Sequence, residues 1–430
     1  MTIFRRIPDL VVLTLLGISV TALRCPADDP PVKPTLPSSK AASDLESTKA
    51  LVRGNTRFAL DLYRRLKGDR NLFFSPNGVS EALAICFEGA RGATADQMAQ
   101  VLGFPEGGSR LGVRFQRLRE AGVGLNSDVV TFKSANSLWS ELPLNSGFES
   151  EVRDGFDAEL FEVDFKSPSS REEVRQWVRT QTDGAAELPA ESLSDPLLRL
   201  LVINTLLFKA SWAQQFDSEF TFDKPFELMD GTSTDVPTMW QKGVFRYGSW
   251  DDLEILEMPY AGGRASAFIL LPAKSDSDSD DSTESVSPLE HLEDALTVAE
   301  LENRLSALSP NQLNVYLPRF SITSNLSLGE ALQGLGMSLP FQPDADFSGI
   351  TVADQLYIGK VLQDARIDFD EGGTEAAVVT VVTTVGRGIS QKPPPPPVLF
   401  KADRPFMFLV RENSTGSMLF MGRVIEPLED

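Results

Sequence analysis

The run Leu197–Phe208 constrains the fold more than any other part of the sequence. It reads LLRLLVINTLLF and is almost entirely apolar. Such a run predicts a strand buried on both faces, at the centre of a sheet that is covered on both sides. Apolar residues at near-helical spacing precede it in Lys49–Lys67, and further strand-like runs follow it. The sequence therefore predicts an α+β fold.

Other segments add elements to this fold. A second helix is predicted after Ser75, with proline at its first position. Thr94 and Gln97 have the spacing of a capping box for a third helix. The remaining predicted strands are Val129–Trp139, runs within Phe226–Tyr260, Ala265–Leu271, Leu313–Ile322 and Ser417–Val424. Helices thus dominate the first third of the chain and strands dominate the rest.

Residues 1–22 are predicted to be a secretory signal peptide. Arg5 and Arg6 precede the apolar run Leu10–Val20, and small residues follow up to Ala22, as signal peptidase requires. The apolar run is short for a membrane span. We therefore expect a secreted protein, extracellular or periplasmic, without stable membrane association.

The segment after the signal peptide is rich in proline and serine. Residues 23–48 are predicted to be a linker, followed by one domain over residues 49–430. A lipid-modified Cys25 is an alternative to free secretion, but Arg24 fits poorly before such a site. The only other cysteine, Cys86, lies in an apolar stretch and is predicted to be a small buried hydrophobe.

Composition and charge exclude several classes of function. The 430-residue chain has 42% apolar residues and a formal net charge of −21. Its apolar content suffices for a sizeable core, and its acidity argues against nucleic acid or an anionic membrane as partner. The acidic segment 273–287 is predicted to be a solvated surface loop, with calcium binding as a weaker reading.

Histidine is almost absent, and this excludes most hydrolytic mechanisms. His291 is the only histidine, so a Ser-His-Asp or Cys-His arrangement would have to use it. Histidine-rich metal sites and the phosphate-binding P-loop are absent from the sequence. Catalysis by carboxylates alone stays open, because the chain has 61 Asp and Glu residues. We expect no enzyme activity, no cofactor and no metal.

The stretch Glu371–Pro397 combines features that are seldom found together. It reads EGGTEAAVVTVVTTVGRGISQKPPPPP. Its β-branched residues are typical of a strand, whereas its flanking glycines and prolines are typical of an exposed loop. Arg387 is the only arginine in the stretch. The sequence therefore predicts a loop with the composition of a strand, and a single arginine exposed on it.

Several segments in order resemble the serpins, the serine protease inhibitor family. The matching pieces are NLFFSP (71–76), FEGARGATADQM (87–98), VINTLLFKASWAQQFD (202–217), LEMPY (256–260), VYLPRFSI (315–322), LGM with ADFSGI (335–350), EGGTEAA (371–377) and DRPFMFLVRENSTGSMLFMGRV (403–424). The resemblance covers about residue 50 to the C-terminus. It implies one α+β domain with about nine helices around three β-sheets, the largest five-stranded, and an exposed reactive-centre loop over 371–397.

The resemblance also implies a mechanism for that loop. A target protease cuts the loop and forms an acyl-enzyme; the freed loop then inserts into the main sheet and the protease is trapped. The residues that match the hinge at the loop base are Glu371, Gly372, Gly373, Thr374, Glu375, Ala376 and Ala377. Glycines allow the backbone to swing, and no proline interrupts Glu371–Arg387. The hinge composition therefore favours an inhibitor.

Alternation along an inserted strand predicts which loop side chains enter the core. Successive residues point to opposite faces. One set would point inward: Thr374, Ala376, Val378, Thr380, Val382 and Thr384. Only Glu375 carries charge between Thr374 and Val385, and it falls in the outward set. The loop is thus compatible with burial as a strand.

The resemblance places the reactive bond at Arg387–Gly388. An arginine at that position implies a trypsin-like serine protease as target, because such enzymes hold a carboxylate in the specificity pocket. A cysteine protease remains an alternative, since the trap needs only an acyl intermediate. Lys392 is a second basic residue, but Pro393 follows it and opposes cleavage. We expect a monomer that binds its target covalently.

Two polar positions depart from the family pattern. Ser75 and Asn204 match a cluster beneath the main sheet, called here the shutter, but Gly78 stands where serine is usual and Gln363 where histidine is usual. Glutamine can still donate and accept hydrogen bonds, so we expect an altered but working shutter. Higher in the sheet, Trp212, Arg319 and Glu371 match positions at the loop base. The main rival function is a non-inhibitory serpin that acts as a carrier or chaperone.

Overall fold

The computed structural model describes residues 39–105, 111–184, 187–274, 287–374 and 396–428. The chain divides into two compact units, Met1–Ala42 and Ser43–Asp430. Only residues 39–42 of the first unit are described, so the account below concerns the second. The predicted signal peptide, Cys25, most of the acidic segment and the reactive bond at Arg387 lie outside the described residues.

The described residues contain nine α-helices. They are α1 (Ser39–Leu66), α2 (Pro76–Gly89), α3 (Gly92–Leu102), α4 (Leu111–Val123), α5 (Ser146–Phe156), α6 (Pro168–Gln181), α7 (Pro288–Ala295), α8 (Val298–Ala307) and α9 (Gly329–Gly334). As predicted, Ser75 caps α2: its side chain accepts a hydrogen bond from the backbone N–H of Gly78.

Fifteen strands are described. They are β1 (Leu72–Phe74), β2 (Val130–Ser140), β3 (Glu159–Glu162), β4 (Leu200–Ser211), β5 (Thr221–Glu227), β6 (Ser233–Ser249), β7 (Leu253–Pro259), β8 (Ala265–Pro272), β9 (Ser309–Pro318), β10 (Phe320–Ser327), β11 (Lys360–Phe369), β12 (Gly373–Thr374), β13 (Val398–Lys401), β14 (Phe406–Glu412) and β15 (Met418–Val424). The helix-rich start and strand-rich remainder confirm the α+β prediction.

One sheet has six strands in the order β10-β11-β12-β4-β2-β3. Five of them are of ordinary length, whereas β12 has only two residues and lies between the upper ends of β11 and β4. Every residue of β4 except Lys209 is buried, as the apolar run predicts. This sheet corresponds to the predicted five-stranded sheet, with the short β12 added to it.

The other nine strands form a second sheet, in the order β1-β15-β14-β8-β7-β6-β9-β13, with β5 also paired to β6. The two smaller sheets implied by the resemblance are therefore hydrogen-bonded into one in the described structure. The reason is the length of β6, whose 17 residues pair with β9 in the middle and with β5 and β7 towards the ends.

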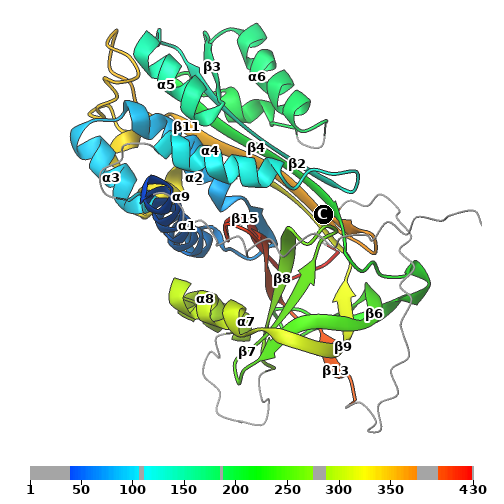
Figure 1. The fold of residues 1–430 in the computed structure, drawn as a ribbon. Coiled ribbons are helices and arrows are strands. Elements are labelled where there is room, and N and C mark those ends of the chain that lie inside the picture. The colour runs from blue at the N-terminus through cyan, green and yellow to red at the C-terminus, as the bar shows by residue number, and fades with distance from the viewer. Residues whose placement is uncertain (1–38, 106–110, 185–186, 275–286, 375–395, 429–430) are drawn as a thin grey trace, which may run out of the picture. The chain divides into compact units, whose positions relative to one another are not determined.

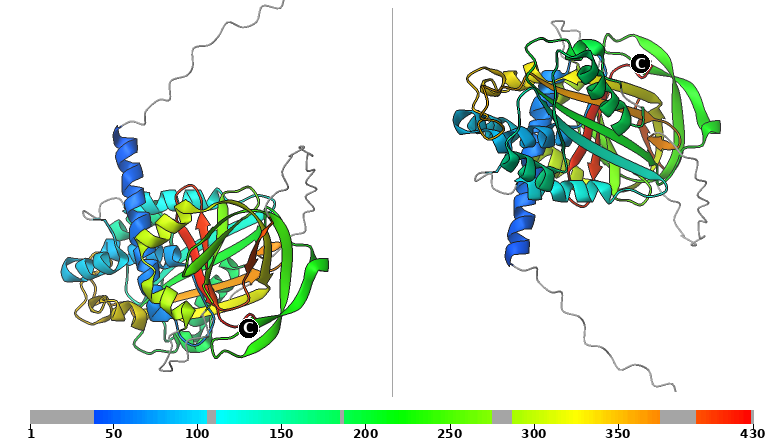
Figure 2. Two further views of the ribbon diagram at one scale, coloured as in Figure 1. Left: turned by 90° about the horizontal axis from the view of Figure 1, so that it is seen from below. Right: turned by 90° about the horizontal axis from the view of Figure 1, so that it is seen from above.

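Helices and sheets pack around a core that runs between the two sheets. Helix α2 packs against both β4 and β15, and α6 packs against β2 and β4. In Figure 1, α7 and α8 lie beside the second sheet, and α7 also contacts α1 through Tyr63 and Glu293. Both views in Figure 2 show the red C-terminal strands in the middle, between the blue helices and the green strands of the second sheet. Helix α2 thus lies between the six-stranded sheet and the second sheet and contacts both.

The predicted capping box of α3 is wrong. The helix begins at Gly92 and has no side-chain cap at its N-terminus. Thr94 Oγ1 instead accepts a hydrogen bond from the backbone of Asp346 at 2.9 Å, and Gln97 Oε1 accepts one from Leu339 at 2.8 Å. Both side chains therefore fix a distant loop, a tertiary use that local spacing does not reveal.

Helix α1 begins earlier than predicted, at Ser39. The part of the predicted linker from residue 39 to residue 48 is therefore helical. The segment after Pro37 contains alanines, leucine and glutamate, which are strong helix formers, and Glu46 pairs with Lys49 at 2.9 Å.

Cys86 is a free, fully buried thiol, which confirms its predicted role as a small hydrophobe. Burial raises the pKa of its thiol to about 12. Within the described ranges, no helix has both the length and the apolar character needed to cross a membrane. The same part of the chain holds no group of three or more His, Cys, Asp or Glu side chains arranged as metal ligands.

Candidate functional site at the opening between β4 and β11

The six-stranded sheet, called the large sheet below, is open at the end from which the predicted loop leaves. Strands β4 and β11 pair directly in parallel, with 201–206 opposite 360–365. Beyond that point they separate. The two residues of β12 fill the opening: Thr374 pairs with Phe369 on β11 and with Ala210 on β4. The first residues of the loop have therefore already entered the sheet as a strand.

Thr374 points into the core. It is fully buried, and its hydroxyl lies 2.8 Å from the hydroxyl of Tyr260. Tyr260 in turn stacks on Trp212, with ring centroids 4.6 Å apart. Burial raises the pKa of the Tyr260 hydroxyl, so this group stays neutral. The structure thus places Thr374 on the inward face, the face given by strand alternation.

Glycine is the only residue type that fits at position 373. Its backbone has φ of +151°, and a Cβ atom there would lie 2.0 Å from the carbonyl oxygen of Ala210. Both the conformation and the close approach exclude other side chains. Asp370 organises the preceding turn, because its carboxylate accepts hydrogen bonds from the backbone N–H groups of Gly372 and Gly373 at 2.8 and 3.0 Å.

An ion pair fixes the base of the loop to the neighbouring sheet. Arg319 Nε lies 2.8 and 2.7 Å from the two carboxylate oxygens of Glu371, and Thr221 also hydrogen-bonds to this carboxylate. Burial alone would raise the pKa of Glu371, but the hydrogen bonds from Arg319 and Thr221 outweigh it and lower that pKa. Glu371 is therefore held as a carboxylate at neutral pH.

Trp212 closes the top of the opening through its backbone and its ring. Its backbone N–H donates to the carbonyl of Gly372 at 2.8 Å, and its indole N–H donates to the carbonyl of Asp370 at 3.0 Å. The backbone N–H of Phe216 donates to the carbonyl of Glu371 at 2.9 Å. Trp212 and Phe216 thus hold the segment 370–372 by donating hydrogen bonds to its three consecutive carbonyl groups.

The shutter residues meet lower down, behind the paired part of β4 and β11. Gln363 accepts a hydrogen bond from the backbone N–H of Ser75 at 2.8 Å and donates to the Ser75 carbonyl at 3.0 Å. It also donates to Asn204 Oδ1 at 2.8 Å. Asn204 donates to Asn136 Oδ1 on β2 at 2.8 Å. One network therefore ties α2 to three adjacent strands.

This network explains why glycine, and not the usual serine, stands at position 78. A Cβ at Gly78 would lie 2.2 Å from Asn204 Oδ1 and 2.7 Å from Leu206 Cδ1. The amide of Asn204 occupies the space that a side chain at residue 78 would need. Gln363, which stands where histidine is usual, bridges Asn204 and the backbone of Ser75.

Four residues that contribute side chains to the site were not found from the sequence: Asn136, Asp370, Tyr260 and Thr221. Asn136 lies directly opposite Asn204 in the register of β2 and β4, so a correct strand alignment would have identified it. Tyr260 and Thr221 lie outside the large sheet and reach Thr374 and Glu371 only through the tertiary fold. No local pattern indicates that either residue contacts the base of the loop.

Comparison with known proteins settles the family. The family model described as "Serpin (serine protease inhibitor)" matches residues 53–427, which is most of the chain.

The chain belongs to the serpin family. It is 35% identical over 387 residues to human leukocyte elastase inhibitor, covering 87% of this chain and 98% of that protein. An uncharacterized serpin-like protein of Thermococcus kodakarensis is 34% identical over 400 residues, covering 91% of this chain and 90% of that one. Serpins as a family inhibit serine proteases and are not catalysts.

Solved serpin structures have the same fold. Human thyroxine-binding globulin, solved with thyroxine, has a TM-score of 0.77 and 27% identity, covering 90% of this chain and 100% of that one. Uncleaved ovalbumin has a TM-score of 0.75 and 26% identity, covering 88% and 100%. The serpin fold predicted from the motifs is confirmed.

Substituting serine, the residue usual in serpins, at Gly78 should destabilise this protein. Gly78→Ser drives a side chain into Asn204, and overpacking of this kind typically costs about 1–3 kcal/mol. The midpoint of urea unfolding should fall accordingly. Adding Gln363→His should recover part of the loss, because the effects of two substitutions in one hydrogen-bond network on the free energy of unfolding are not additive. The matched control is Gly147→Ser, a helical glycine with no atom within 4 Å of its Cβ position; an equal loss there would contradict the steric explanation.

Proposed function

We propose that this serpin is a secreted inhibitor of trypsin-like serine proteases that acts as a suicide substrate. The observation that carries the proposal is β12. The hinge residues Gly373 and Thr374 already lie between β4 and β11 as a strand, so the sheet has room at the point where insertion has to begin. Export rests on the sequence of residues 1–22, which precede the described residues.

The chemistry needs only the backbone of the loop. The protease serine attacks the carbonyl carbon of Arg387, the Arg387–Gly388 amide bond breaks, and the amine of Gly388 leaves with a proton. The new loop end remains on the protease as an ester. Insertion of the loop then competes with attack by water on that ester. Rapid insertion gives a trapped protease, and slow insertion gives a cleaved inhibitor and a free protease.

The register of β12 predicts how the inserted loop would meet the shutter. Thr374 pairs with Phe369 and Ala210. Six residues further along the loop is Thr380, and six residues back along the two flanking strands are Gln363 and Asn204. Insertion therefore separates the Gln363–Asn204 hydrogen bond and places Thr380 between the two amides. A threonine hydroxyl can donate to one amide and accept from the other, which would compensate for the broken bond.

The arginine separates this serpin from its elastase-inhibiting relatives. Leukocyte elastase inhibitors are named for elastase, whose specificity pocket takes small side chains, whereas Arg387 fits a pocket with a carboxylate. We propose a trypsin-like target on this ground. A cysteine protease is a further possible target, since its thiolate forms an equivalent acyl intermediate.

A denaturing gel tests the proposal directly. The purified protein is mixed with slightly substoichiometric trypsin, with elastase and papain in parallel, and any released peptide is sequenced. A band at the summed mass with trypsin, and a peptide that starts at Gly388, are expected. Cleavage at Arg387 with free, active trypsin would contradict inhibition, and a complex with elastase alone would contradict the specificity.

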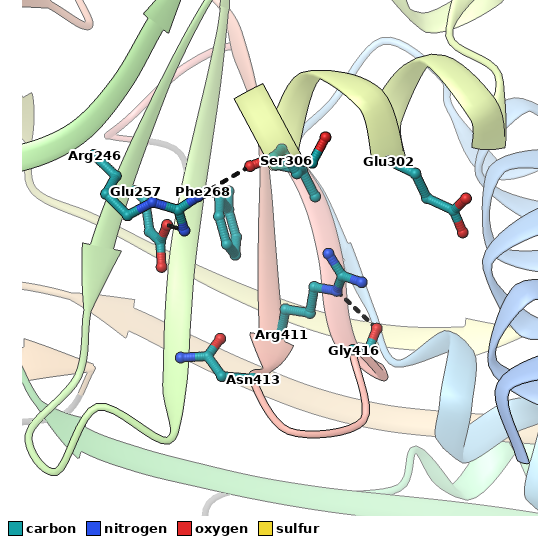
Figure 3. A pocket seen from close by; sticks show the side chains of 9 residues that line it. Arg246, Glu257, Phe268, Glu302, Ser306, Arg411, Asn413 and Gly416 are labelled. Carbon is teal, nitrogen blue, oxygen red and sulfur yellow. Dashed lines mark hydrogen bonds and ion pairs between the residues drawn. The ribbon is translucent and has the colours of Figure 1, made fainter. Parts of the chain in front are cut away.

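A second function, small-molecule carriage, is supported by one cavity. A pocket of about 480 Å³ lies between α8 and the second sheet, within the size range of ligand sites. Figure 3 shows Arg411 pointing towards its centre, with Glu302 and Ser306 on the helix above it. Arg411 is held by the Gly416 carbonyl at 2.7 Å, and Arg246 is paired with Glu257 at 2.6 Å. Thyroxine-binding globulin, a serpin of the same fold, was solved with a bound small molecule.

The carrier function predicts that removing a positive and a negative charge from this pocket has opposite effects on the affinity for an anionic ligand. If the pocket binds small anions, Arg411→Met should weaken binding of the fluorescent anion anilinonaphthalene sulfonate by about tenfold to a hundredfold, since a hydrogen bond to a charged group contributes roughly 1.5–3 kcal/mol. Glu302→Gln should strengthen binding, because it removes a negative charge from the lining. Fluorescence titration measures both. Equal affinity in the two variants would exclude this pocket as a carrier site.

A further inference from the structure

The joint between β4 and β11 has a second polar pair, on the face opposite the shutter. Asp364 follows Gln363 on β11 and Thr205 follows Asn204 on β4, and these two residues lie opposite each other in the parallel register. Residues in register on neighbouring parallel strands have side chains on the same face. Asp364 and Thr205 therefore share the face that α6 covers, and each is only 1% exposed.

Neither side chain is fully satisfied. Asp364 Oδ1 accepts a hydrogen bond from the side-chain amide of Asn325 on β10. Among the described residues, no group bonds to Asp364 Oδ2 or to Thr205 Oγ1. Buried polar atoms are normally paired, so two unpaired atoms at adjacent register positions need an explanation. A buried carboxylate without a cation is costlier still.

Among the residues that the structure describes, none offers Asp364 a positive charge. An apolar cluster that includes Trp139, Ile203 and Leu362 lies on this face. The charged groups of the surrounding elements have other partners or lie further along the strands. On the strands, Lys360 bonds to the Ser192 carbonyl, Arg366 pairs with Asp368, Lys209 lies near Asp368, and Lys133 of β2 pairs with Asp183. On α6, Arg175 and Arg179 pair with Glu172 and Glu187. In the closed sheet, in which β4 and β11 pair directly, the neutral carboxyl of Asp364 is therefore more stable than the carboxylate.

We propose that Asp364 and Thr205 form a proton-dependent lock on the opening of the sheet. With Asp364 neutral, its Oδ2–H donates to Thr205 Oγ1 after a side-chain rotation and joins β11 to β4. With Asp364 ionised, its Oδ2 can only accept from the Thr205 hydroxyl, and a carboxylate buried without a cation destabilises the closed sheet. The inference rests on the proposed function in one respect only, namely that the loop inserts between these two strands. Asp364 and Thr205 are positioning residues that touch no substrate.

The sign of the pH dependence follows from burial. Desolvation raises the pKa of Asp364 in the closed sheet, and opening admits water and returns the pKa towards its ordinary value. The neutral form thus stabilises the closed sheet at low pH, and this stabilisation is lost as pH rises through the raised pKa. Between the ordinary and the raised pKa, the rate of opening should increase about tenfold per pH unit, and it should level off above.

Insertion of a separate peptide measures opening without a protease. A synthetic peptide with the sequence of residues 374–385 is incubated with the intact protein between pH 4.5 and 8, and the rate of stable peptide incorporation is followed by native gel and tryptophan fluorescence. For the wild-type protein we expect slow incorporation at low pH and faster incorporation at high pH. Asp364→Asn keeps a neutral donor, so its rate should be slow and nearly independent of pH.

Two further variants separate the lock from a general effect on stability. Thr205→Val removes the hydrogen-bond partner of Asp364 and should speed incorporation at low pH by about fivefold, the equivalent of one ordinary hydrogen bond. Asp368→Asn is the matched control: the residue lies on the same face of β11 but is paired with Ser321 and Arg366, so the pH profile should keep its shape.

The possible failures are distinguishable. Incorporation in the wild type at the same rate at every pH, or an unchanged profile in Asp364→Asn, overturns the lock and leaves the inhibitory mechanism intact. A protein that incorporates no peptide at any pH and traps no protease contradicts strand insertion itself, and with it the lock.

Discussion

Thr374→Arg should convert this serpin from an inhibitor into a substrate of trypsin. Thr374 is fully buried between β4 and β11 and faces Tyr260, so an arginine would place an unpaired cation in the core. Such a charge costs several kcal/mol, and each ~1.4 kcal/mol slows a step about tenfold. Insertion should slow by about a hundredfold or more, and water should release the protease first. The number of inhibitor molecules consumed per trypsin should rise steeply, while cleavage at Arg387 continues.

One control variant and one measurement on the free protein keep this prediction specific. Thr374→Ser retains the hydroxyl partner of Tyr260 and should leave the stoichiometry near that of the wild type. Because β12 is already part of the sheet, Thr374→Arg should also displace it before any cleavage, and the fluorescence of Trp212 should change in the free protein. Undiminished trapping by Thr374→Arg would mean that residue 374 does not enter the sheet during inhibition.

Arg387→Ala should abolish the inhibition of trypsin. Truncating one partner of a buried charge pair costs about 2–5 kcal/mol, so the association rate constant should fall by about a thousandfold. The hinge and the shutter are unchanged in this variant, and its thermal stability should equal that of the wild type. Progress curves of trypsin activity in the presence of the inhibitor measure the rate constant.

The other basic residue of the loop provides the control. Lys392→Ala should inhibit trypsin at the wild-type rate, because Pro393 opposes cleavage after residue 392. Arg387→Val should transfer inhibition to elastase, whose pocket takes small side chains, if the rest of the trap is intact. Loss of trypsin inhibition in Lys392→Ala instead of Arg387→Ala would move the reactive bond to residue 392.

Features within one element were predictable because they depend on local physics. The apolar run that becomes β4 had no place except a covered sheet, and Ser75 followed by proline marked the start of α2. Thr94 and Gln97 show the limit of such reasoning. Their spacing suits a capping box, yet both bond to the backbone of residues in the segment 339–346. Local spacing gives the bonds that are possible, and tertiary packing decides which of them form.

The shutter shows the same division at the level of the site. Gly78 and Gln363 stood out as departures from a family pattern, but the sequence offered no reason for either. The structure supplies it: Asn204 fills the space beside Gly78, and Gln363 reaches from Asn204 to the backbone of Ser75. Asn136 joins the network through strand register, a relation between distant segments that no single segment contains.

The sequence by itself determined the α+β class, the serpin family and the composition of a loop that can become a strand. Each follows from apolar periodicity, from ordered motifs or from the lack of charge and proline, all of which are local properties. Only the tertiary structure decided that β12 already occupies the opening between β4 and β11, and that Asp364 lies opposite Thr205 where these two strands pair directly. Both are consequences of pairing between strands far apart in the chain, and the free energy of such pairing depends on which surfaces meet.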